Sequence, residues 1–182
     1  CRRCVRIHQQ PHKIILKKRV VITGEGSISP LGHNSKSLWK NLVEGKSGID
    51  YISSFDTENF SIKIAGEVKD FDPNNFFESK EARKLDRFTM FGVIAAGQAL
   101  ESSNYNSSEA GVIVGTGVGG MHTLEEEHQK LLKKGQRGVS PFYVPKMIPN
   151  IAGGQIAIKN NLHGLNFSMS TACSSATDAI GM

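Results

Sequence analysis

The stretch that decides the fold is GVIVGTGVGG, residues 111–120. Its first half, Gly111 to Gly115, is a short apolar run rich in β-branched residues, which predicts a buried strand. The second half is a glycine-rich turn. It leads into an amphipathic segment, residues 123–134, that begins acidic and ends in lysines, as the helix dipole favours. A buried strand that turns tightly into a helix is typical of an α/β fold with a largely parallel sheet.

The rest of the chain repeats this alternation of strands and helices. Apolar runs that predict further strands, the second of them weak, occur at residues 19–24, 61–68 and 165–170. Helical patterns occur at residues 37–44, 81–101 and 151–159. The centre of the 81–101 helix is almost wholly apolar or small, so we expect it to be buried. A proline-bearing loop is expected over 140–149, and Cys173 is predicted to open a last helix.

Composition and charge exclude two classes of function. The 182 residues are 38% hydrophobic and 21% charged, as in ordinary globular proteins. The net charge of +5 arises from seven basic residues before Glu25, and the remainder carries 15 basic against 17 acidic residues. We therefore do not expect the folded part to bind nucleic acid. No apolar run approaches the ~20 residues that span a bilayer, so no membrane segment is expected.

The basic leader, residues 1–17, is treated apart from the fold. It has no starting Met and no acidic residue, which fits an artificial extension, a translated partial sequence or the remnant of a transit segment. The three cysteines are Cys1, Cys4 and Cys173, and this is no disulfide framework. Cys1 and Cys4, with His8 and His12 nearby, do not complete a zinc pattern, so we expect no metal and favour a reducing compartment.

The glycine turn also satisfies the dinucleotide-binding pattern G-x-G-x-x-G, at residues 115–120. That fingerprint requires an acidic residue about 20 positions later, at the end of a second strand. The corresponding region here, SPFYVPK at residues 140–146, is no such strand. The context therefore favours a turn in which backbones pass closely, with a nicotinamide site as the weaker alternative.

The chemistry centres on STACSSATDAIGM, residues 170–182. Cys173 lies among small hydroxyl residues at a predicted strand-to-helix turn. A helix N-terminus favours the thiolate, which is the reactive form of cysteine, and its free N–H groups can stabilise an oxyanion. From the residues alone, Cys173 is either a nucleophile or a buried structural cysteine.

Six segments taken together resemble the β-ketoacyl-acyl carrier protein synthases, closest to the type II elongating enzymes. They are KRVVITGEGSISPLG (18–32), LWKNLVEGKSGI (38–49), KEARKLDRF (80–88), GTGVGG (115–120), VSPFYVPKMIPNIAGGQIAI (139–158) and STACSSATDAIG (170–181). The resemblance implies a thiolase-like layered α/β fold built of two similar halves. Residues 18–182 would be the N-terminal half, ending just after the nucleophile.

The resemblance also implies an activity. The parent would be a condensing enzyme of fatty acid biosynthesis, an acyltransferase that loads an acyl chain on Cys173. A decarboxylative Claisen condensation with malonyl-acyl carrier protein would follow, with no cofactor or metal. The Cys173 backbone N–H would be one oxyanion donor, and the second donor and two histidines would lie in the second half. The histidines that match no family motif are His33, His122, His128 and His163. We therefore expect this chain alone to be inactive in condensation.

Further site residues and partners follow from the same resemblance. Val118 and Tyr143 would line the acyl pocket, Tyr143 from the neighbouring subunit, and ordinary core packing is the alternative for both. Lys80, Arg83 and Lys84 would receive the acidic acyl carrier protein, and a solvated helix face is the alternative. The implied partners are this carrier with its acyl and malonyl thioesters, and a second copy in a homodimer. The location would be cytoplasmic in a bacterium, or the mitochondrial matrix or plastid.

The sequence is also compatible with other functions. A polyketide ketosynthase or a thiolase would use the same nucleophile. A chain-length-factor-like dimerising partner or a truncated pseudo-enzyme would not catalyse, although Cys173 argues against the former. The chain departs from the commoner family pattern at Gly164-Leu-Asn and at Ser175-Ala-Thr-Asp. Ala176 is still small and Asp178 suits the helix dipole, so neither departure removes the nucleophile.

Overall fold

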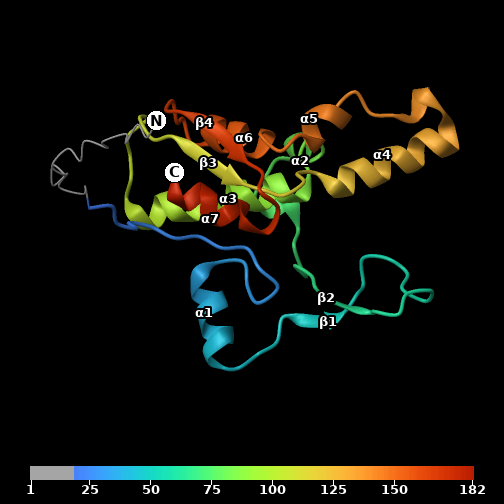
Figure 1. Ribbon diagram of the computed structural model, residues 1–182, viewed down its shortest axis with the longest axis horizontal. Helices are drawn as coiled ribbons and strands as arrows, with labels where there is room; N and C mark the ends of the chain where they lie inside the picture. The colour runs from blue at the N-terminus through green and yellow to red at the C-terminus, as the bar shows by residue number, and fades with distance from the viewer. Residues whose placement is uncertain (1–18) are drawn as a thin grey trace, which may run out of the picture.

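Two parallel strands form the centre of the computed structural model, which describes residues 19–182 (Figure 1). They are β3 (Val112–Gly115) and β4 (Asn166–Met169), and Val112 pairs with Asn166 at one end and Gly115 with Met169 at the other. The chain between them forms three helices, which are α4 (Met121–Lys134), α5 (Tyr143–Met147) and α6 (Ile151–Lys159). This arrangement confirms the predicted α/β class with parallel pairing.

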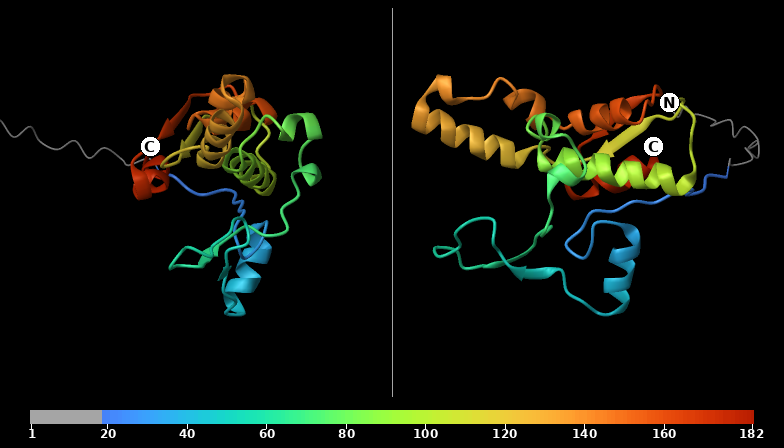
Figure 2. Two further views of the ribbon diagram at one scale, coloured as in Figure 1. Left: turned by 90° about the vertical axis from the view of Figure 1, so that its right-hand side faces the viewer. Right: turned by 180° about the vertical axis from the view of Figure 1, so that it is seen from behind.

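Helices cover both faces of this strand pair. The left view of Figure 2 shows α6 and α3 (Arg87–Ser103) on one side and α7 (Ser175–Gly181) on the other. Side chains alternate along a strand, so Val112 and Val114 face the first side, where they join the hydrophobic core. The other residues of that buried cluster are Phe77, Leu85, Met90, Val93, Ile94 and Ile156. Gly115 faces α7.

The predicted helix over 81–101 is two helices, α2 (Ser79–Ala82) and α3. The break occurs because Asp86 is the N-cap of α3, where its carboxylate accepts the N–H of Phe88 at 3.1 Å. The same buried carboxylate accepts the backbone N–H of Thr123 at 3.0 Å and its hydroxyl at 2.5 Å. Asp86 therefore joins the start of α3 to the first turn of α4.

A smaller lobe lies beside the main body (Figure 1). It contains α1 (Ser35–Val43) and the antiparallel pair β1 (Ile49–Tyr51) and β2 (Ile64–Gly66). Gln98 of α3 connects the lobe to the body, because its amide donates to the carbonyl of His33 at 2.7 Å and accepts the N–H of Ser27 at 3.0 Å.

The predicted buried strand over residues 19–24 is wrong for the described structure. A strand needs a hydrogen-bonded neighbour, and Val20 and Ile22 are instead 91% and 90% exposed. The segment runs along the end of α3, where the N–H of Glu25 donates to the hydroxyl of Ser102 at 2.9 Å.

The remaining predictions differ only in detail. The helices expected at 37–44, 123–134 and 151–159 are confirmed, and the last has the predicted bounds. The proline-bearing loop over 140–149 contains the short helix α5, because Pro145 lies in its first turn, where no donor is needed. Short 3-10 turns lie at Pro73–Asn75, Gln136–Gly138 and Ala172–Ser174. Within residues 19–182 no helix is both long and apolar enough to cross a membrane.

Candidate active site

Cys173 lies between the carboxyl end of β4 and the start of α7. It belongs to the 3-10 turn Ala172–Ser174, and Ser174 separates it from the first residue of α7. The prediction that Cys173 itself opens this helix is therefore wrong by two residues. The side chain is exposed and its thiol is free. Among the described residues the thiol is therefore not buried, and its role as a nucleophile stays a prediction.

Hydroxyl side chains hold the turn around Cys173. The buried Ser175 hydroxyl donates to the carbonyl of Ala172 at 2.7 Å and accepts the N–H of Thr171 at 2.9 Å. The Ser174 hydroxyl donates to the Thr171 carbonyl at 2.8 Å, and the Thr171 hydroxyl donates to the Asp178 carboxylate. From the sequence, only a favourable interaction with the helix dipole was predicted for Asp178. The spacing of seven residues between Thr171 and Asp178, about two helical turns, could have indicated this hydrogen bond.

Ala172 has a left-handed backbone, with φ of +51°. This conformation is uncommon for a residue with a Cβ, and such residues cluster at active sites, where the surroundings impose them. Here Ser175 imposes it by bonding to both sides of Ala172. A strained turn between a strand and a helix is a known way to present a nucleophile.

The glycine turn after β3 lies directly against the Cys173 turn. A Cβ added to Gly115 would lie 2.3 Å from the carbonyl oxygen of Ser175, and one added to Gly119, whose φ is +80°, would lie 2.5 Å from that of Met147. The Ser170 hydroxyl donates to the Gly117 carbonyl at 3.1 Å. These glycines allow close backbone approach, as the sequence predicted for this turn.

The structure brings the segments of three predicted site residues together at this turn. Val118 belongs to it and is 56% exposed. Tyr143 is half-buried at the start of α5, whose last residue, Met147, accepts the N–H of Gly120 at 2.9 Å. The Cys173 turn, Val118 and the helix of Tyr143 are thus neighbours around one set of backbone contacts.

The predicted carrier-docking residues form one exposed group. Lys80 lies on α2, Arg83 caps it, and Lys84 follows, all with exposed side chains. The Lys84 ammonium lies 5.5 Å from the ring centroid of Phe142, which precedes α5. This cation–π contact joins the basic group to the segment that carries Tyr143.

The four histidines in the described region contact groups other than the thiol or lie exposed. His33 contacts the Lys69 carbonyl at 2.9 Å, His163 the Asn161 side chain at 3.1 Å, and His122 pairs with Glu126 at 3.3 Å. His128 is exposed. No hydrogen bond of residues 19–182 links a histidine to Cys173, and no group of three metal-ligating side chains occurs there. Cys1, Cys4, His8 and His12 lie outside the described residues.

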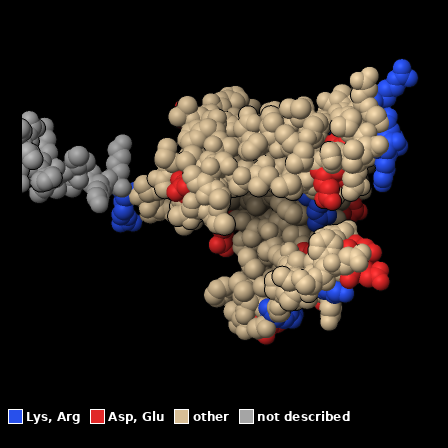
Figure 3. Space-filling model, turned by 45° about the vertical axis from the view of Figure 1, so that its right-hand side comes forward, with Lys and Arg blue, Asp and Glu red and all other residues tan. Residues whose placement is uncertain are grey.

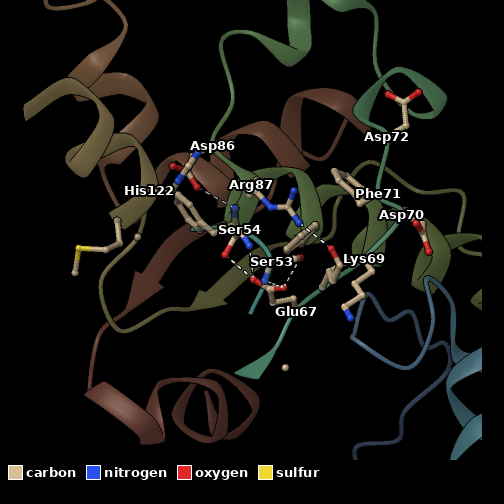
Figure 4. Close-up of a pocket in the computed structure, with 16 residues that line it drawn as sticks. Ser53, Ser54, Glu67, Lys69, Asp70, Phe71, Asp72, Asp86, Arg87 and His122 are labelled. Carbon is tan, nitrogen blue, oxygen red and sulfur yellow. Dashed lines mark hydrogen bonds between the residues drawn. The ribbon is translucent and has the colours of Figure 1, made fainter. Parts of the chain in front are cut away.

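A pocket of about 1020 Å³ lies between the body and the smaller lobe. It is visible as a hollow in Figure 3, and Figure 4 shows Glu67 hydrogen-bonded to Ser53 and Ser54. Glu67 accepts hydrogen bonds from Ser53 and Ser54, and Arg87 donates to the Val68 carbonyl at 3.1 Å. Arg87 also lies over the rings of Phe71 and Phe91. The contacts of Arg87 join the lobe to the body, whereas those of Glu67 link two segments within the lobe.

Comparison with known proteins identifies the family. A family model described as the N-terminal domain of β-ketoacyl synthase matches residues 17–182. The chain belongs to the β-ketoacyl synthase family. It is 44% identical over 169 residues to the 3-oxoacyl-[acyl-carrier-protein] synthase 2 of Staphylococcus aureus (strain COL), and 45% identical over 170 residues to that of Vibrio cholerae. Each match covers 90% or 91% of this chain but only 41% of the relative.

Solved ketosynthase structures share the fold. The ishigamide ketosynthase/chain length factor superposes with a TM-score of 0.75 at 25% identity, over 83% of this chain and 39% of that one. A ketosynthase in complex with a type II polyketide acyl-carrier protein gives a TM-score of 0.71 at 23% identity, over 88% of this β-ketoacyl synthase chain and 44% of that one. The predicted thiolase-like fold, of which this chain covers the N-terminal part, is therefore confirmed.

We expect Gly115→Ala to displace the Cys173 turn, because the new Cβ would lie 2.3 Å from the Ser175 backbone oxygen. Overpacking of this kind costs about 1–3 kcal/mol. Urea unfolding and the rate of Cys173 alkylation by iodoacetamide measure the two effects. Gly97→Ala is the control, since a Cβ there meets nothing within 4 Å in the middle of α3, and it should be neutral or stabilising. Equal effects of the two substitutions would contradict the close approach.

Acid should weaken the contact within the lobe between Glu67 and the serines Ser53 and Ser54. Hydrogen bonds from Ser54 and Ser53 lower the pKa of Glu67 from 4.5 to about 2. Because the folded-state pKa is depressed, the stabilisation is complete above pH 4.5 and is lost as the pH falls from 4.5 toward 2. A carboxylate NMR titration measures this pKa directly, and Ser54→Ala should raise it toward 4.5. A wild-type midpoint near 4.5 would show that the serines do not hold the carboxylate.

Proposed function

We propose that this chain is the N-terminal part of a 3-oxoacyl-[acyl-carrier-protein] synthase that elongates acyl chains in fatty acid biosynthesis. The observation that carries the proposal is the exposed Cys173 in a strained turn between β4 and α7. The names of the relatives that are 44% and 45% identical support the substrate class.

The chemistry would proceed in two transfers. The Cys173 thiolate attacks the thioester carbonyl of an acyl-carrier protein. A C–S bond forms on Cys173, the C–S bond to the carrier breaks, and the carrier leaves as a thiolate that takes a proton from solvent. Malonyl-carrier then loses carbon dioxide to give an enolate, whose carbon attacks the Cys173 thioester. A C–C bond forms, the C–S bond breaks, and the thiolate is regenerated. Backbone N–H groups stabilise each oxyanion, and that of Cys173 itself would be one of them.

The proposal gives roles to the other residues around the turn. Val118 and Tyr143 would line the acyl pocket, Tyr143 from the second subunit of a homodimer. Lys80, Arg83 and Lys84 would bind the acidic carrier protein, and their common exposure on and beside α2 supports this. The location would be the bacterial cytoplasm, or the mitochondrial matrix or plastid.

Replacement of the nucleophile tests the chemistry. In the full-length parent enzyme, Cys173→Ala should lower formation of the 3-oxoacyl product from acyl-carrier and malonyl-carrier by at least about a thousandfold. In the intact parent, limiting iodoacetamide should modify Cys173 before Cys1 or Cys4. Turnover by Cys173→Ala near the wild-type rate, or alkylation that spares Cys173, would refute the proposed nucleophile.

Charge reversal tests carrier docking separately from the chemistry. Arg83→Glu should raise the KM for acyl-carrier protein about tenfold, the equivalent of ~1.4 kcal/mol, because it repels an acidic partner. Activity on a small acyl thioester without the carrier should be unchanged. Lys36→Glu is the matched control, because Lys36 is an exposed lysine of α1 in the separate lobe. Equal losses on carrier-bound and small thioesters would count against docking at Arg83.

A further inference from the structure

Two carboxylates are nearly fully buried in the described part of the chain, Asp86 and Glu127, each 4% exposed. Burying a charge is unfavourable unless it is paired and hydrogen-bonded, so each needs a structural or functional reason. Asp86 has one, because it joins the starts of α3 and α4. Glu127 takes no part in that junction or in the chemistry proposed for Cys173.

Glu127 holds the first residue of the segment that leads to α5. One carboxylate oxygen accepts the backbone N–H of Ser140 at 2.6 Å, and the other accepts the ammonium of Lys130 at 2.6 Å. Lys130 and the Ser140 N–H lower the pKa of Glu127, so it is ionised at neutral pH. Hydrogen bonds to an ionised acceptor are about twice as strong as neutral ones.

Ser140 in turn sets where Tyr143 lies. Its hydroxyl accepts the N–H of Phe142 at 3.1 Å, and its carbonyl accepts the N–H of Tyr143 at 3.0 Å. The far end of the segment is held by the bond from Gly120 to the Met147 carbonyl. Hydrogen bonds therefore hold both ends of residues 140–147, one to Glu127 on α4 and the other to the glycine turn that contains Val118.

We propose that Glu127 is a positioning residue that fixes Tyr143 through Ser140 and so sets which acyl chain lengths the pocket accepts. The inference rests on the proposed function, in which Tyr143 lines that pocket. Release of Ser140 moves the aromatic wall and leaves the Cys173 turn unchanged, because that turn is held by its own hydroxyl contacts.

The test uses the full-length parent enzyme and acyl-carrier substrates of several chain lengths. Glu127→Leu removes both acceptor oxygens at similar volume, and it should change the ratio of kcat/KM between long and short substrates about tenfold, the discrimination that one methylene can supply. Glu127→Gln keeps an amide oxygen for the Ser140 N–H, so it should restore most of the wild-type ratio. Glu126→Leu is the matched control, because Glu126 is the adjacent carboxylate and its side chain is 47% exposed.

Two measurements that need no turnover accompany the kinetics. The amides of Phe142 and Tyr143 should exchange hydrogen faster in Glu127→Leu than in wild type, and the alkylation rate of Cys173 should not change. If Glu127→Leu does not fold, Glu127→Asp, whose carboxylate is one methylene shorter, should show the same changes to a smaller degree.

Three results would overturn the proposal. An unchanged chain-length profile with faster exchange would mean that Tyr143 does not form the pocket wall. A uniform loss at every chain length, together with slower alkylation, would give Glu127 a role in the fold only. A wild-type parent that condenses no acyl chain would refute the proposed function and the pocket role with it, and the exchange data would still show whether Glu127 holds the segment.

Discussion

The contact between Gly115 and the backbone of Ser175 is the constraint on which the rest of the site depends. Any side chain at Gly115 would displace the first turn of α7, so α7 can pack this closely on β3 only because the strand residue there has no Cβ. With α7 seated there, Ser175 is buried and its hydroxyl bonds to both Thr171 and Ala172. The left-handed Ala172 and the exposed Cys173 follow from that arrangement.

Two buried carboxylates also hold the elements around the site, because they accept hydrogen bonds from the N–H groups of helix starts and of a loop. Asp86 fixes α4 against α3, and Glu127 of α4 fixes Ser140 ahead of α5. Both accept backbone N–H groups that otherwise would have no partner at the end of a regular element. The basic residues Lys80, Arg83 and Lys84 are therefore connected to the segment of Tyr143 through Asp86, α4 and Glu127. The contact between Lys84 and Phe142 is a second connection.

The features that the sequence predicted well are those encoded within a few residues. The run Gly111–Gly115 and the helical periodicity of 151–159 act locally, and the structure contains both elements. The small residues around Cys173 left open whether its thiol is buried, and in the structure it is exposed. The roles of Val118 and Tyr143 came from the resemblance to a family, because no local pattern distinguishes a pocket wall from a core residue.

The features that the sequence did not predict depend on distant partners. The break before α3 follows from the local N-cap at Asp86, but the bond that joins Asp86 to Thr123 spans 37 residues. The segment over 19–24 has the composition of a strand, but pairing requires a neighbour that no local pattern specifies. The link from Glu127 to Ser140 spans 13 residues and a turn whose path is set by tertiary packing.

The suspension of residues 140–147 by their ends has a consequence for engineering. The interior of the segment bears side chains that are partly or largely open to solvent, among them Phe142 at 43% and Val144 at 54% exposure. Libraries that vary these positions, and keep Ser140 and the glycine turn, would change the wall of the proposed pocket. They would leave unchanged the backbone contacts that hold the Cys173 turn. Under the proposed function, presentation of the nucleophile and selection of the acyl chain would be carried by separate parts of the polypeptide, which can be redesigned one at a time.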